Sequence, residues 1–427
     1  MNELSLVSDL DRFDFGLEEA ASVLAQSGNL YGVFKDAPES ELNNTAMQTL
    51  HQAIESMQSR TGVFYSTVSM ESSTTATELK TYTLEGLKEF GKSVWQAIVK
   101  ALAALYAKIK EFFTGNERKV KKMKEDLKKA DEDYKQASKD AVKADKEATE
   151  VYFELDNPAH QLLHKSLYTG SNKASGVSVT TELHDIVSHL NDYVMKSKEH
   201  HLIEGISDFK EKLLIVLDSV DADKLKSDTD SKTMVVDKLY TVMDNYVNGS
   251  TLHYEVNVNK AKFKDVTTHT EFDAEYGGKR YVIDFSTSKS TDPLSVNNLR
   301  TDGIISRVRS AIDVEKLIIK GVESRDVYHL SDALSLNMEN QTKGVLVSKE
   351  LLGLVEHLTD MVKSAEKDES LGSDNKYVII LSLVIKAVNA IVKLFTVIHS
   401  DVSATVTAHF NLYLKFIEEL KKQNNSV

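Results

Sequence analysis

The chain of 427 residues contains no cysteine, three prolines and one tryptophan. The absence of cysteine excludes disulfides, thiolate metal sites and cysteine nucleophiles, and it fits synthesis in a reducing cytoplasm. Because proline interrupts helices, so few prolines leave room for long ones. The sequence also lacks a glycine-rich phosphate loop, a GxSxG nucleophile elbow and an HExxH zinc motif. These absences argue against an enzyme, and we expect no cofactor and no bound metal.

Long hydrophobic runs are scarce as well. The strongest one, Tyr377–Ile398, contains two lysines, each of which costs about 2.5–3.5 kcal/mol at a bilayer centre. Polar residues recur along it at steps of four and three: Ser382, Lys386, Asn389, Lys393, Thr396 and Ser400. We therefore predict a central bundle helix with one polar stripe facing water, rather than a transmembrane helix. The first twenty residues are acidic and contain no apolar run, so we expect no secretory signal.

The formal net charge of −13 is distributed unevenly. Residues 1–71 carry eleven acidic and three basic side chains, which gives −8 and leaves −5 for the remainder. We predict short helices at Leu17–Leu24 and Ala46–Met57, separated by a turn-prone stretch and too charged to build a core alone. An acidic chain also argues against sequence-specific nucleic-acid binding, because phosphate recognition needs a basic surface.

A polar stretch beginning at Ser66 is expected to be an exposed linker. Apolar residues then recur three and four apart on a helix with a lysine-rich rim, and Thr114–Asn116 predicts the end of that helix. The candidate amphipathic face contains Leu87, Val94, Trp95, Ile98, Leu105 and Phe112. We favour docking of this face on the bundle of the same chain, and the alternative is contact with a membrane surface.

The following charged segment, up to Asn157–Pro158, carries a heptad seam with steps of three and four. The candidate interaction seam comprises Val120, Met123, Leu127, Tyr134, Val151 and Leu155. Several seam positions between them are alanine, which buries little area. We therefore expect a coiled-coil-like helix that pairs within the chain, rather than a dimerisation zipper.

The rest of the chain predicts helical hairpins at 158–250, with helices over 180–195, 202–217 and 234–247. At Gly277–Gly278 a two-residue turn between alternating arms predicts a β-hairpin, with Tyr276 opposite Lys279 and Glu275 opposite Arg280. Helices are expected at 296–319 and 349–364, and the last helical stretch, 376–422, is one helix or two. The predicted fold is mainly α, a long-helix bundle with a coiled-coil-like helix and a small antiparallel β-hairpin insertion. The predicted units are 1–71, 72–157, 158–250, 251–290 and 291–427.

This order of blocks resembles the internal head, or inner-body, proteins of large tailed bacteriophages. The segment TLEGLKEFGKSVWQAIVKALAALYAKIKEFF is similar to the amphipathic helix that follows their propeptide, and the closing VIKAVNAIVKLFTVIHSDVSATVTAHFNLYLKFIEEL is similar to their C-terminal helix. The resemblance implies an N-terminal propeptide that a prohead protease removes after Ser, Ala or Gly, any residue, then Glu. Ser69-Met70-Glu71 fits this pattern, and Ala76-Thr77-Glu78 is a secondary candidate. Ala37-Pro38-Glu39 also fits, inside the acidic block.

The resemblance implies a non-enzymatic virion structural protein, made in the bacterial host cytoplasm and packaged inside the capsid. Its partners would be other phage head proteins and the prohead protease, with packaged DNA nearby and ejection with that DNA as a further implication. Two alternatives remain open: a membrane-active or pore-forming helical protein, and a generic helical scaffold or adaptor. Membrane contact is the less favoured reading, and the oligomeric state is left open.

Overall fold

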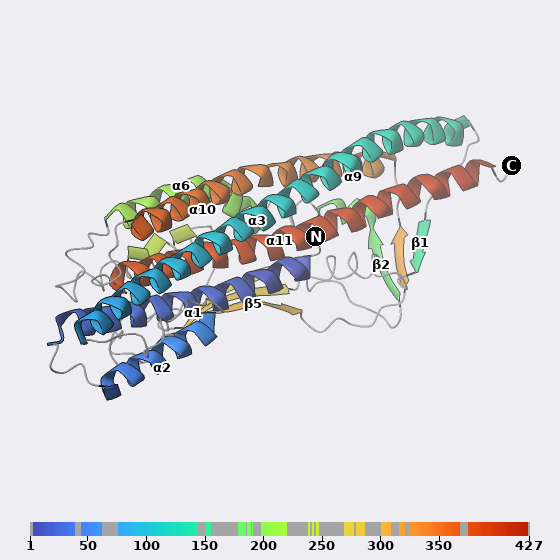
Figure 1. Ribbon diagram of the computed structural model, residues 1–427. Helices are drawn as coiled ribbons and strands as arrows, with labels where there is room; N and C mark the ends of the chain where they lie inside the picture. The colour runs from blue at the N-terminus through green and yellow to red at the C-terminus, as the bar shows by residue number, and fades with distance from the viewer. Residues whose placement is uncertain are drawn as a thin grey trace.

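The computed structural model shows an elongated helical bundle with two small sheets (Figure 1). The residues it describes are 3–38, 44–61, 76–143, 150–154, 178–184, 186–188, 190, 198–219, 238–239, 241–242, 245–246, 269–276, 279–286, 300–308, 316–320, 324–367 and 375–425. The predicted fold class, a mainly α long-helix bundle, is confirmed at this level. The boundaries of the five predicted units stay predictions.

Two long helices form the axis of the bundle. The 68-residue α3 (Ala76–Lys143) and the 51-residue α11 (Asn375–Asn425) run in the same direction. At about 1.5 Å per residue, α3 is roughly 100 Å long. Opposite to both run α9 (Ser324–Thr342) and α10 (Gly344–Lys367), which follow one another with a single turn residue between them. Apolar residues three and four apart in each helix bury one face, so the four helices share a continuous core.

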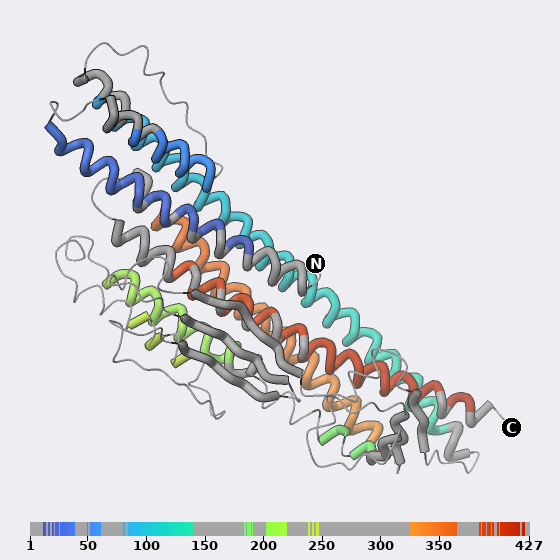
Figure 2. Tube along the Cα trace, turned by 90° about the horizontal axis from the view of Figure 1, so that it is seen from below, coloured from blue at the N-terminus to red at the C-terminus, as the bar shows by residue number. Residues whose placement is uncertain are grey.

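Three further helices pack on this frame. The N-terminal α1 (Glu3–Asp36) runs antiparallel to α3 and lies against both α3 and α11, as Figures 1 and 2 show. On α1 packs α2 (Asn44–Thr61), and on α10 packs α6 (Lys198–Asp218). The last of these confirms the helix predicted over 202–217. The final helical stretch is one continuous helix, α11, and α10 includes the helix predicted over 349–364.

One sheet has three strands in the order β1-β6-β2. The central β6 (Lys316–Lys320) is antiparallel to β1 (Glu150–Glu154) and parallel to β2 (Ser178–Glu182). The start of the helix predicted over 180–195 is therefore wrong, because residues 180–182 belong to β2. Val151, predicted to continue the helical seam, lies in β1 opposite Ile319. The prediction that the charged helix reaches Asn157 is therefore wrong, because α3 ends at Lys143 and strand β1 begins at Glu150.

The second sheet is antiparallel, in the order β3-β4-β5. Strand β3 (His269–Tyr276) pairs with β4 (Lys279–Ser286), and β4 pairs with β5 (Arg300–Val308), with an irregularity between Ile283 and Phe285. The helix predicted over 296–319 is wrong, because this segment supplies β5 and most of β6. A self-contained β insertion over 251–290 stays a prediction: residues 251–268 and 287–290 lie outside the described residues, and β5 lies beyond the predicted boundary.

Two predicted helix breaks are also absent from the structure. Helix α3 continues through Thr114–Asn116, where a helix end was predicted. One glycine costs a helix only about 1 kcal/mol, and buried Phe112, Phe113 and Val120 hold both sides of this point in the core. Helix α1 likewise continues to Asp36 through the stretch predicted to turn, because Leu30, Tyr31 and Phe34 still pack against the core.

Candidate functional site

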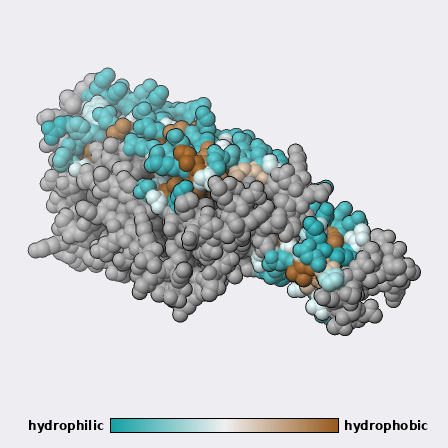
Figure 3. All heavy atoms as spheres, turned by 90° about the vertical axis from the view of Figure 1, so that its left-hand side faces the viewer, coloured by the Kyte–Doolittle hydropathy of each residue, from teal (hydrophilic) through white to brown (hydrophobic). Residues whose placement is uncertain are grey.

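The predicted amphipathic face of α3 is buried inside the molecule. Its six residues are 1–6% exposed, apart from Val94, which is completely buried. They belong to the core cluster that α1, α10 and α11 also enter: Leu87, Val94, Trp95, Ile98, Leu105 and Phe112. In this structure the face is therefore occupied by the chain's own helices. Figure 3 shows the end of the bundle that lies on the left in Figure 1. The described surface there is mainly hydrophilic, with small separate hydrophobic patches.

The predicted seam is occupied within the chain as far as α3 extends. Val120, Leu127 and Tyr134 are buried, and Met123 is half-buried against the core with its Sδ 3.8 Å from Thr407 Oγ1 of α11. The structure does not bring Val151 into this set, because β1 carries it, and Leu155 lies outside the described residues. The sequence pattern thus found the packing face of α3 but extended it too far.

A polar cluster joins three helices at the far end of this seam. Asp131 Oδ1 of α3 accepts hydrogen bonds of 2.6 Å from Ser331 Oγ of α9 and from Tyr413 Oη of α11. Burial and the bond to Asp131 raise the pKa of Tyr413 above its usual value. The Tyr134 ring meets the Tyr328 ring edge-on, with centroids 5.2 Å apart. Sequence analysis missed this cluster, because nothing in the spacing links three residues so far apart in the chain.

The middle of the polar stripe of α11 points inward, so the prediction that the stripe faces water is wrong there; the side chains of Ser382 and Lys386 lie outside the described residues. Asn389, Lys393 and Thr396 are at most 1% exposed. Helix α11 contacts α1, α3, α9 and α10, and this leaves it little surface for solvent. The stripe continues to His399, whose ring stacks on Phe395 with centroids 5.6 Å apart and lies edge-on to Phe112 at 5.9 Å. This stripe is thus part of the interior.

The N-terminal helices are part of the shared hydrophobic core, which is compatible with the expectation that this segment is too charged to build a core alone. From α1 and α2 the core takes Leu17, Ala20, Val23, Leu24, Ile54 and Met57, all at most 8% exposed. Burying a large aliphatic side chain contributes about 1.5–3 kcal/mol, so five such residues contribute on the order of 10 kcal/mol before entropy is counted. The acidic segment is an integral layer of the bundle.

Polar contacts fasten the C-terminal end of α1 to the beginning of α3. Lys80 Nζ donates a 2.7 Å hydrogen bond to the backbone oxygen of Ala37, one residue after α1 ends. About two turns further along α3, Lys88 Nζ lies 5.8 Å from the centroid of the Tyr31 ring, a cation–π distance. Lys88 of the predicted basic rim and Lys80, which precedes that rim, therefore contact the acidic N-terminal segment.

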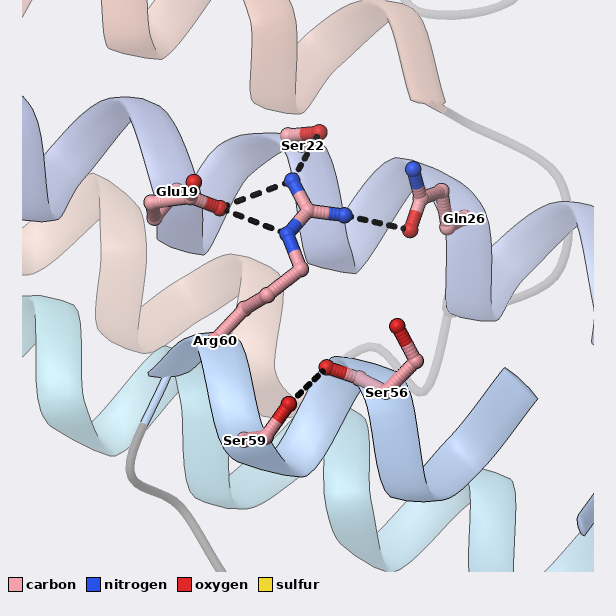
Figure 4. Close-up of polar contacts among 6 residues, drawn as sticks. All are labelled: Glu19, Ser22, Gln26, Ser56, Ser59 and Arg60. Carbon is pink, nitrogen blue, oxygen red and sulfur yellow. Dashed lines mark hydrogen bonds and ion pairs between the residues drawn. The ribbon is translucent and has the colours of Figure 1, made fainter. Parts of the chain in front are cut away.

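A single arginine fastens α2 to α1 (Figure 4). Arg60 Nε and Nη2 lie 2.9 and 2.7 Å from Glu19 Oε2, and Nη1 donates a 3.0 Å bond to Gln26 Oε1. Its Nη2 also donates to Ser22 Oγ at 3.1 Å. Since these α1 residues are spaced at three and four, they lie on one face of the helix. The planar guanidinium matches this array, although partial exposure limits what the ion pair contributes.

The candidate processing residues lie at the edge of this arrangement. Ser69, Met70 and Glu71 fall outside the described residues, between the end of α2 at Thr61 and the start of α3. The secondary candidate, Ala76–Glu78, forms the first turn of α3. Pro38, in the third match to the pattern, follows α1 and is exposed.

The described residues offer no metal or membrane-spanning site. Within them, no group of three or more histidine, aspartate or glutamate side chains could hold a metal ion. Among the helices that the structure describes, none is both long enough and apolar enough to span a bilayer. The arrangement is one of packing surfaces and helix-to-helix ties.

Comparison with known proteins gives one match. No curated protein and no solved structure is significantly similar to the chain. Residues 5–161 match the family model of phiKZ-like phage internal head proteins, and this range includes nearly all of α1 together with α2, α3 and β1. The match covers 157 of the 427 residues, and the family is described as internal head proteins of phages. The resemblance to internal head proteins of large phages, predicted from the sequence, is thus confirmed over residues 5–161.

Proposed function

We propose that this chain is a non-enzymatic structural protein of the phage virion, packaged inside the head with other head proteins as its partners. The observation that carries the proposal is the family match over residues 5–161. The described side chains support it, since the apolar face of α3 packs in the core from Leu87 to Ala137. In the membrane-active alternative, residues such as Trp95 and Ile98 would first have to leave the core. No observation favours that alternative.

We further propose that a prohead protease cuts the chain after Glu71 during head maturation. Residues 62–75 join two helical parts and contain the Ser-Met-Glu pattern. The cut would separate a segment of charge −8 from a body of charge −5. The cleaved protein could then leave the head with the packaged DNA. We also propose that residues 251–290 form a β insertion and that the chain divides into the five units predicted from its sequence.

Protection from an external protease tests the location. Purified virions are treated with a broad-specificity protease before and after the capsid is opened, and peptides of this chain are quantified by mass spectrometry. An internal protein is protected in intact virions and degraded once they are opened, while a known surface protein of the same particles serves as the control. Degradation in intact virions, or absence of the chain from them, would refute the internal location.

Terminal peptides from the same virions test the processing. Cleavage after Glu71 produces a chain beginning at Ser72, which mass spectrometry identifies after labelling of free amino termini. An uncut junction peptide spanning residues 69–78 in mature virions would contradict the processing proposal and leave the internal location intact.

A further inference from the structure

We infer that the N-terminal segment remains bound to the body after a cut between Thr61 and Ala76, so that processing yields a two-chain complex and not a free propeptide. The partner surface is the one formed by α3 and α11, which α1 covers in the intact chain. The inference deepens the proposed function and relies on it only for the existence of such a cut in the phage.

The first support is the depth at which α1 is buried. Val23 is completely buried, and Leu17 and Leu24 are 4% and 3% exposed. Residues packed to this degree lose many contacts when a helix departs, and the surface left behind would expose apolar side chains of α3 and α11 to water. These contacts are made by residues of α1, which a cut between Thr61 and Ala76 leaves intact.

The second support is the distribution of polar ties along the interface. Lys80 and Lys88 of α3 hold the C-terminal end of α1, at Ala37 and Tyr31. Arg60 holds α2 on α1 close to the point where the chain leaves α2 at Thr61. These contacts join residues 3–61 to one another or to α3, so a cut in 62–75 breaks none of them.

Charge supports the same partner. The segment 1–71 carries −8, while the first half of α3 carries several lysines, two of which make the contacts above. Opposite charges on two surfaces in contact favour their association and disfavour like-charged competitors. The occupant that fits this surface of α3 and α11 is therefore the chain's own N-terminal segment, before and after cleavage.

The experiment uses the full chain with a recognition sequence for a site-specific protease substituted within residues 66–72. The purified protein is cut to completion, passed over a size-exclusion column at micromolar concentration and examined by native mass spectrometry. We expect both fragments to elute together as one complex. Separation of the N-terminal fragment from the rest of the cut protein under these conditions would overturn the inference.

Two variants make the measurement specific. Leu24→Ala removes a buried contact, and after cutting it should increase the dissociation rate of the fragment more than about tenfold. Val33→Ala, on the same helix, truncates a side chain that is 66% exposed and should leave the rate unchanged. Circular dichroism before cutting verifies that each variant is folded. Equal dissociation of the two variants would contradict the role of the buried face.

Failure of this inference is distinguishable from failure of the proposed function. An uncut chain in virions would remove the processing proposal while the complex measured in solution still stood. Conversely, rapid separation in solution would overturn retention and leave both the internal location and the cleavage untouched.

Discussion

Gly115 lies in the middle of α3, and a Cβ added there would meet no atom within 4 Å. Alanine loses less backbone entropy than glycine on entering a helix. Gly115→Ala should therefore raise the free energy of unfolding by about 0.5–1 kcal/mol, measured by urea unfolding followed by circular dichroism. The matched control is Gly205→Ala in α6, where the Cβ would lie 3.3 Å from Cδ2 and Cε2 of Tyr246. An equal gain at both positions would show that space around the new methyl group is irrelevant.

Two buried tyrosines make the fold sensitive to alkali. Burial raises the pKa of Tyr246 and of Tyr413 above the usual value near 10, and Asp131 adds to the effect at Tyr413. A raised pKa in the folded state means that the folded chain holds the proton more tightly. The stabilisation is present below about pH 10 and is lost as the pH rises above it.

Tyr246→Phe tests this dependence. At neutral pH it should cost about 1 kcal/mol, since the Oη of Tyr246 donates a 2.8 Å hydrogen bond to the backbone oxygen of Leu202. Above pH 10 the free energy of unfolding should fall less steeply in the variant than in the parent, by up to about 1.4 kcal/mol per pH unit. Chemical denaturation at pH 8 to 11 measures both. Parallel curves for parent and variant throughout this range would refute the assignment.

At the scale of a single element, α9 stands out for the polarity of its buried side. Asp326, Ser331, Asn337 and Gln341 are all at most 6% exposed. Ser331 is satisfied by Asp131, but the buried Nε2 and Oε1 of Gln341 make no hydrogen bond within the described part of the chain. Buried polar atoms without partners lower stability, so α9 is held less firmly than the mainly apolar α10.

Gln341→Met replaces this amide by an apolar side chain of similar length. Because the desolvation penalty of the two amide atoms disappears, the free energy of unfolding should rise by about 1–3 kcal/mol. Hydrogen exchange of α9 amides, compared with those of α10, should slow in parallel. Glu339→Met, at an exposed position of the same helix, is the control and should gain nothing. Loss of stability in Gln341→Met would indicate that the amide has partners that the substitution removed.

Periodicity predicted which residues of a helix share a face, but not what that face contacts. In α3 the seam residues Val120, Leu127 and Tyr134 are buried as a set. In α11, by contrast, Asn389 and Lys393 share a face as predicted, yet the face points inward. The direction follows from how many helices surround α11, which is a property of the assembled bundle and not of its own sequence.

The hydrophobic periodicity of the sequence indicates the full extent of α1, although the many acidic residues around it favour a shorter helix. Phe13, Leu17 and Ala20 begin a series with steps of four and three, the same period as the seam of α3, and Leu24 and Tyr31 continue it. Because acidic residues surround these positions, the predicted helix is limited to Leu17–Leu24. The helix predicted over 296–319 is wrong for another reason. Short apolar runs fit a strand and a helix equally well, and pairing with β4 and β1 decides between them.

At the scale of the whole molecule, the ends of the chain build one core. The region similar to internal head proteins supplies α1, α2 and α3, while α9, α10 and α11 lie outside that match. Phe113 of α3 packs on Phe395 of α11, with centroids 5.4 Å apart, and Asp131 binds Tyr413. The matched region therefore has its apolar faces covered by helices more than 160 residues further along the chain. The family resemblance thus describes one side of the bundle, and α9, α10 and α11 supply the other.

A bundle organised around one uninterrupted helix has a measurable length. Because the chain contains no cysteine, cysteines introduced at exposed Lys92 and Lys135 are unique sites for spin labels. With α3 continuous through Gly115, these positions are about 65 Å apart at 1.5 Å per residue. Pulsed electron resonance on the Lys92→Cys/Lys135→Cys protein should give one narrow distribution near that value, whereas a bend at Thr114–Asn116 would shorten and broaden it.

The control pair, Lys119→Cys/Lys135→Cys, lies on one side of Gly115 and should report about 24 Å whether or not the helix bends. A main distance below about 50 Å for the long pair, with the short pair unchanged, would show two helices in place of α3. The amphipathic face and the seam would then be free to move relative to one another. The surface that α1 covers would no longer be rigid, and retention of the cut N-terminal segment would lose its structural basis.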